Sequence, residues 1–154
     1  MKIYLDTCCY CRPFDVARQS QTQVEVEAAI IENVVDLCNM TSIPIIGSAA
    51  IITELKNIRD IDKQKDVLNF YTSAVSENIV PSESIFNRTQ ELMDQGITNF
   101  DSAHIALAES VGVDYLLTVD DKLERAAARL KLAIKVINPL NFFEEIIKWA
   151  QSLT

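Results

Sequence analysis

The chain has 154 residues, 49% of them hydrophobic, which predicts one domain over residues 1–154 with a core of its own. It has no apolar run of about 18 residues, which argues against a membrane span. Asp6 interrupts the N-terminal apolar residues, which argues against a signal peptide. Together these features predict a soluble, cytoplasmic protein. The net charge of −8 argues against a general nucleic-acid-binding protein, unless bound metal ions reverse the charge locally.

In the first half of the chain, short apolar runs predict strands, and apolar residues three or four positions apart predict helices. In chain order we expect a strand over 2–5 that ends at Asp6, a loop that contains Arg12, Pro13, Phe14 and Asp15, a helix over 23–40, a strand over 42–46 ended by Gly47, a helix from its N-cap Ser48 to residue 58, and a helix over 62–75.

In the second half, Gly96 and Gly112 predict the ends of two helices. We expect helices over 83–95 and 100–111, the second capped by Thr98 or Asn99, a strand over 113–119, a helix over 122–130, a strand over 133–137 and a final amphipathic helix over 141–152. Short apolar strands that alternate with helices are typical of a parallel sheet covered on both faces. The sequence therefore predicts an α/β protein, with three layers (α/β/α) around a short central parallel sheet.

Four acidic residues interrupt apolar segments at places where such a sheet would bring them together. Asp6 and Asp120 follow strands, and open parallel sheets bind ligands beyond the carboxyl ends of their strands. Glu54 shares a helix face with apolar residues, and Asp101 lies in the first turn of its helix. Each acid also has a purely structural alternative: Asp120 as an N-cap, Asp101 as a partner of the helix dipole, and Glu54 as a solvated residue.

Clustered carboxylates repel one another and stay ionised together only when a cation is bound. Mg²⁺ and Mn²⁺ prefer oxygen ligands and can activate water for attack on phosphorus. The four acids Asp6, Glu54, Asp101 and Asp120 are therefore predicted to be both metal ligands and catalytic residues of an enzyme that hydrolyses phosphodiester bonds.

Four segments of the chain resemble the PIN-domain family. They are MKIYLDT at the N-terminus, IITEL over 51–55, NFDSAHIALAE over 99–109 and YLLTVDDKL over 115–123, and the resemblance extends to the Ile-Asn-Pro before the last helix. It implies a Rossmann-like fold and a Mg²⁺- or Mn²⁺-dependent endoribonuclease, with the same four acids in its site and Thr118 as the hydroxyl of a T-x-D element. Many bacterial members are VapC-like toxins, so the resemblance also implies an antitoxin partner and a homodimer.

A few other residues are candidates for the site. Arg12, in the loop after Asp6, is predicted to bind substrate phosphate together with the Thr118 hydroxyl; the alternative for Arg12 is a solvent-exposed residue without a role. His104 is the only histidine, and it is either a metal ligand or base, or a partly buried residue bonded to the backbone or a nearby acid. Asp121 is an alternative to Asp120, which matches T-x-D better.

The cysteines Cys8, Cys9, Cys11 and Cys38 are expected to be free thiols, because C-C-x-C with one distant cysteine is a poor zinc motif. The main alternative to a nuclease is a non-catalytic RNA- or protein-binding module with a structural metal site. A phosphatase is a weaker alternative, because residues 6–8 read Asp-Thr-Cys rather than D-x-D. The chain has neither G-x-G-x-x-G nor a P-loop, which argues against binding of dinucleotides and nucleoside triphosphates.

Overall fold

The computed structural model describes residues 1–15 and 21–154. Within them, five strands form one parallel sheet in the order β3-β2-β1-β4-β5. The strands are β1 (Ile3–Leu5), β2 (Ile45–Ser48), β3 (Glu77–Ile79), β4 (Tyr115–Leu117) and β5 (Lys135–Ile137). The central strand β1 is completely buried, and its Leu5 pairs in register with Leu117 of β4.

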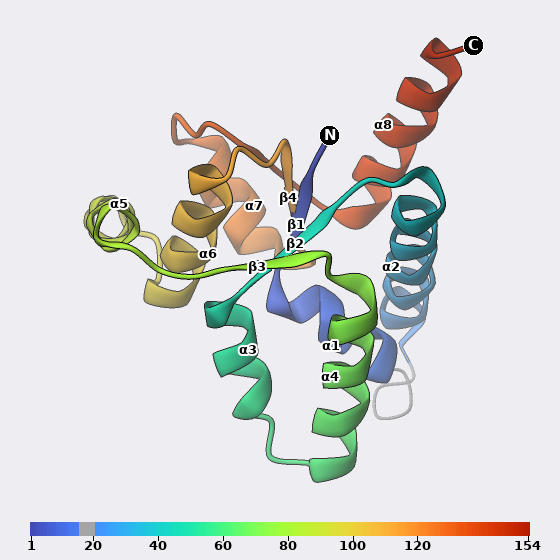
Figure 1. Cartoon of the computed structure of the whole chain (residues 1–154), viewed down its shortest axis with the longest axis horizontal. Coiled ribbons are helices and arrows are strands. Elements are labelled where there is room, and N and C mark those ends of the chain that lie inside the picture. Colours follow the sequence, from blue (N-terminus) through green and yellow to red (C-terminus); the bar gives the residue numbers. More distant parts are fainter. Residues whose placement is uncertain (16–20) are drawn as a thin grey trace.

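Helices cover both faces of this sheet (Figure 1). They are α1 (Thr7–Asp15), α2 (Thr22–Thr41), α3 (Ala49–Lys56), α4 (Ile61–Ala74), α5 (Glu83–Asp94), α6 (Asn99–Ser110), α7 (Asp121–Ala128) and α8 (Pro139–Ser152). Figure 1 shows α1, α2 and α4 on one side of the strands and α5, α6 and α7 on the other, while α8 packs against α2. The predicted three-layer α/β/α arrangement is confirmed.

Several local predictions are also confirmed. Ser48 is the N-cap of α3, since its Oγ accepts a hydrogen bond from the N–H of Ile51 at 3.3 Å. Gly96 and Gly112 follow α5 and α6 with φ values of 97° and 66°, the left-handed conformation that glycine adopts without strain. No helix in the described ranges combines the length and the apolar character that a membrane span needs.

The predicted loop after β1 is wrong for residues 7–15, which form helix α1. Thr7, Cys9 and Tyr10 are buried on the inner side of this helix, so packing stabilises it in spite of Pro13 in its last turn. Strand β3 was not predicted, because it lies at the sheet edge and its first two residues are exposed and polar.

Gly47 lies inside β2 instead of ending it, so that prediction is wrong as well. The reason is a close approach from α4: a Cβ atom on Gly47 would lie 2.0 Å from the hydroxyl oxygen of Tyr71. The same hydroxyl accepts a hydrogen bond from the N–H of Ser48 at 3.0 Å. Glycine is thus required here by contact with a neighbouring side chain and not by a turn.

Candidate active site

Asp6 lies at the carboxyl end of the central strand, and groups from two elements hold its carboxylate. Oδ1 accepts the N–H of Thr7 at 2.7 Å, and Oδ2 accepts the hydroxyl of Thr118 at 3.0 Å. The thiol of Cys8 lies 3.4 Å from the same Oδ2. Asp6 is only 6% exposed, so its charge depends on these donors.

Thr118 connects Asp6 to Asp120. Its Oγ1 accepts the N–H of Asp120 at 3.0 Å while its hydroxyl donates to Asp6. The pairing of β4 ends at Leu117, so Asp120 does not directly follow the strand as predicted, but is the N-cap of α7. Its Oδ1 accepts the N–H of Lys122 at 2.9 Å. The capping role foreseen as an alternative for Asp120 is therefore confirmed.

Glu54, on α3, faces His104 of α6 and Thr7 of α1. Its Oε1 lies 2.5 Å from Nε2 of His104 and accepts the hydroxyl of Thr7 at 2.8 Å. Partial burial raises the pKa of Glu54, but the hydrogen bond and the charge of His104 outweigh this and hold the pKa below its ordinary value. Glu54 is therefore ionised at neutral pH.

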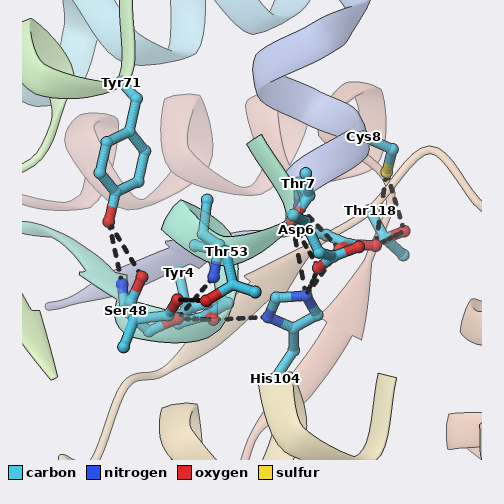
Figure 2. Close-up of polar contacts among 12 residues, drawn as sticks. Tyr4, Asp6, Thr7, Cys8, Ser48, Thr53, Tyr71, His104 and Thr118 are labelled. Atoms are coloured by element: carbon cyan, nitrogen blue, oxygen red, sulfur yellow. Dashed lines mark hydrogen bonds and ion pairs between the residues drawn. The ribbon is translucent and has the colours of Figure 1, made fainter. Parts of the chain in front are cut away.

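His104 is 1% exposed and has a polar partner at each ring nitrogen. Figure 2 shows its ring between Tyr4, whose hydroxyl lies 2.6 Å from Nδ1, and Asp6, whose Oδ1 lies 3.7 Å from Nε2. Burial lowers the pKa of His104, but the bond to Glu54 and the charges of the surrounding acids leave it above its ordinary value. The prediction of a buried histidine bonded to a nearby acid is confirmed.

Asp101 lies in the first turn of α6, and its pKa is affected by burial and by the charges of Asp6 and Asp120. Burial raises the pKa of Asp101, and the negative charges of Asp6 and Asp120 raise it further, while a hydrogen bond from Thr98 lowers it. Asp6 and Asp120 are thus close enough to Asp101 for their charges to affect its pKa.

The acids do not, however, form a finished set of metal ligands. Within residues 1–15 and 21–154, no group of three or more His, Cys, Asp or Glu side chains is arranged to hold a metal ion. Glu54 is bonded to His104 and Thr7 instead, and Asp120 caps α7. The donor atoms are nevertheless the carboxylate oxygens that Mg²⁺ and Mn²⁺ prefer.

Comparison with known proteins identifies the fold. No protein-family model and no curated protein matches the chain. Among solved structures, it is similar to the crystal structure of VapBC2 from Rickettsia felis bound to a promoter DNA fragment. The sequence identity is 16%, the TM-score is 0.61, and the match covers 90% of this chain and 98% of that chain. It is also similar to VapBC-1 from nontypeable Haemophilus influenzae, with 18% identity, a TM-score of 0.57 and coverage of 91% and 99%. The chain has a VapC-like PIN fold.

In this PIN fold, the strand order reverses between β1 and β4, and Asp6 lies just beyond β1 at this point. Open α/β sheets bind ligands in the crevice where the strand order reverses. The position of Asp6 in the PIN fold is thus the position at which a ligand is expected.

The two predicted substrate-binding residues already have partners within the PIN fold. The guanidinium of Arg12 lies 3.7 Å from Asp15 and 3.4 Å from Glu27, so its charge is paired with acids other than the four predicted ones. Thr118 is 1% exposed, and its hydroxyl is used between Asp6 and Asp120. Both assignments to substrate stay predictions.

Sequence reasoning missed Thr7, which bonds to Asp6 and Glu54. It also missed the contacts by which Tyr4 and Ser48 support His104. Thr7 was detectable, because a hydroxyl residue directly follows Asp6 at the end of a strand. The contact of Tyr4 with His104 and with Ser48, at 2.7 Å, joins residues far apart in the chain and leaves no local signal. All four cysteines are free, as predicted.

Proposed function

We propose that this chain is a metal-dependent endoribonuclease, and that it acts as the toxin of a toxin–antitoxin pair. The observation that supports the proposal best is the neighbourhood of Asp6, Glu54 and Asp101 at the carboxyl edge of the sheet. These acids belong to different elements, and His104 lies within hydrogen-bond or ion-pair distance of two of them. Burial, and then the negative charge of Asp6, raise the pKa of Asp101.

The four acids Asp6, Glu54, Asp101 and Asp120 would hold the Mg²⁺ or Mn²⁺, and the bound ion would supply an activated water and stabilisation of charge on the phosphate. The chain's own residues prepare for this role. Thr118 orients Asp6, and His104 keeps Glu54 ionised. A cation among the acids would also relieve the repulsion that raises the pKa of Asp101.

The proposed partners follow from the resemblance of the motifs and from the similar folds. Both solved structures described above are of VapBC proteins. We therefore propose an RNA substrate, an antitoxin protein that restrains the enzyme, a homodimeric state and a cytoplasmic location. The net charge of −8 leaves substrate binding to the metal and to local basic groups and not to the overall field of the protein.

A second candidate is a non-catalytic RNA- or protein-binding module. The net charge of −8 favours its protein-binding form, because an acidic surface suits a basic protein partner. In that case the acids would hold a structural metal or face a basic partner.

Cleavage of labelled RNA by the purified protein separates these candidates. Structured and unstructured RNAs are incubated with Mg²⁺, Mn²⁺ or EDTA, and wild type is compared with Asp101→Asn. Asp62→Asn, at an exposed acid in the first turn of α4, is the matched control. We expect metal-dependent cleavage by wild type and Asp62→Asn, and a loss of at least about 100-fold in Asp101→Asn. Equal cleavage by all three would show that the activity is a contaminant.

A further inference from the structure

His104 is the only histidine of the chain, and it belongs to a buried row of polar side chains that ends at Glu54. Oγ of Ser48 lies 2.7 Å from the hydroxyl oxygen of Tyr4, which lies 2.6 Å from Nδ1 of His104. Nε2 of His104 then lies 2.5 Å from Oε1 of Glu54. The row starts at the end of β2, crosses β1 and α6, and ends on α3. Figure 2 shows its members Ser48, Tyr4 and His104.

Hydrogen-bond chemistry gives this row a direction. Oγ of Ser48 accepts the N–H of Ile51 as the N-cap of α3, so its own hydrogen is available for Tyr4. In the neutral imidazole, Tyr4 donates to Nδ1 of His104 and the ring hydrogen lies on Nε2; in the charged imidazole, Nδ1–H donates to the hydroxyl oxygen of Tyr4. An ionised carboxylate only accepts, so Nε2 is the donor to Glu54 whether the imidazole is neutral or charged.

The two oxygens of Glu54 are therefore not equivalent. Oε1 receives both Nε2–H of His104 and the hydroxyl of Thr7 at 2.8 Å. Oε2 receives no hydrogen bond from any residue in the described ranges, and donors on Oε1 from two different helices restrict rotation of the carboxylate. His104 also lies 3.7 Å from Oδ1 of Asp6, so its N–H reduces the repulsion between the two acids.

We propose that His104 is a positioning residue of this site: it is anchored by Tyr4 and Ser48, holds Oε1 of Glu54, and thereby reserves Oε2 for a divalent cation. This inference rests on the proposed function. It differs from a purely structural role for His104, because it requires the contact with Glu54 to change metal affinity and not only stability.

The single histidine makes a direct test possible, since the imidazole gives one set of signals. Long-range ¹H–¹⁵N spectra of the ¹⁵N-labelled full chain, with any affinity tag removed, are recorded in EDTA and during titration with MgCl₂. We expect a hydrogen on Nε2 and a shift of the Nε2 resonance whose midpoint agrees with the Mg²⁺ affinity from calorimetry. An Nε2 without a hydrogen, or an unchanged resonance while Mg²⁺ binds, would overturn the proposal.

Substitutions of His104 separate its two contacts. The amide of His104→Gln reaches as far as Nε2, whereas the amide of His104→Asn reaches only as far as Nδ1. Loss of an outer partner of a metal ligand typically costs 10–100-fold in affinity. We therefore expect Mn²⁺ affinity, measured from the EPR signal of the free ion, to fall about tenfold or more in His104→Asn and less than about threefold in His104→Gln.

A pair of tyrosine variants keeps the test valid if a His104 variant does not fold. Tyr4→Phe removes the anchor of His104 and is expected to lower Mn²⁺ affinity by about tenfold. Tyr10→Phe is the matched control, because Tyr10 is completely buried and its hydroxyl has no partner within the described residues. It should bind Mn²⁺ like wild type.

The outcomes distinguish this inference from the proposed function. If wild type binds Mn²⁺ and cuts RNA, and every folded His104 and Tyr4 variant binds Mn²⁺ equally well, the role of His104 is refuted and the nuclease proposal stands. If wild type neither binds Mg²⁺ or Mn²⁺ nor cuts RNA, both fall together.

Discussion

The hydroxyl of Thr118, just beyond β4, donates to Oδ2 of Asp6, just beyond β1, at 3.0 Å. Oγ1 of Thr118 also accepts the N–H of Asp120 at 3.0 Å, so one side chain fixes two of the predicted site acids. Thr118→Val has nearly the same shape but leaves both groups without this partner. We expect it to lower the free energy of unfolding in urea by about 1–3 kcal/mol and to lower RNA cleavage by about 10–100-fold.

Thr118→Ser is the matched control for this prediction, because it retains the hydroxyl and loses only a methyl group. It should keep most of the activity and lose less stability than Thr118→Val. Equal losses in the two variants would mean that packing of the methyl group, and not the hydrogen bonds, explains the role of Thr118.

Gly47→Ala tests the contact between β2 and α4. Its Cβ would lie 2.0 Å from the hydroxyl oxygen of Tyr71 and 2.8 Å from Oδ1 of Asn78, so the tyrosine must move. We expect a loss of about 1–3 kcal/mol in thermal or urea unfolding, the usual cost of overpacking. The same change in a Tyr71→Phe background should cost less, because the nearest atom is absent. An additive double variant would contradict this explanation.

Asp101→Asn should stabilise the protein when no metal is bound. Burial first, and then the charges of Asp6 and Asp120, raise the pKa of Asp101, so folding favours its protonated form. The stability from this preference is present in acid and lost as pH rises through the folded-state pKa. At pH 7 in EDTA we therefore expect a higher melting temperature for the variant than for wild type.

This difference should shrink as the pH is lowered toward about 3, where wild-type Asp101 also binds a proton. Addition of Mg²⁺ should raise the melting temperature of wild type more than that of the variant, because a cation replaces the missing proton. A lower melting temperature for Asp101→Asn in EDTA at pH 7 would contradict the repulsion between the acids.

The thiols offer a test of burial that is independent of the proposed function. Burial raises the pKa of Cys11 from the ordinary 9.0 to about 11, and that of Cys38 to about 12. At pH 8 the reactive thiolate should therefore be about 100-fold scarcer at Cys11 and about 1,000-fold scarcer at Cys38 than for an ordinary thiol. Iodoacetamide labelling followed by peptide mass spectrometry measures this, with urea-unfolded protein as the control. Equal rates in folded and unfolded protein would refute it.

Much of the fold could be predicted because long periodic segments carry a strong signal. The helix predicted over 23–40 is α2, Thr22–Thr41, since its apolar residues form one continuous buried face. Helix α1 was missed because Pro13 and polar residues hide the packing of Cys9 and Tyr10. Its burial is decided by neighbouring helices, which a local pattern does not contain.

The site could be predicted only in part. Asp6 was recognisable because it directly follows a buried apolar strand, and Glu54 because it lies on an apolar helix face. The partners of these acids were not, since the contact of Glu54 with His104 joins residues 50 positions apart. The direction of a side chain at that distance depends on how α3 and α6 pack across the edge of the sheet.

The pairing of β1 with β4 has a consequence for a cell that makes this protein. Asp6 is synthesised 112 residues before Thr118, and Asp120 follows Thr118 by two residues. During translation, the early acids exist without the strand and the hydroxyl that complete their surroundings. If the chain is a ribonuclease, the ribosome that produces it is safe from its product until that strand has emerged and paired.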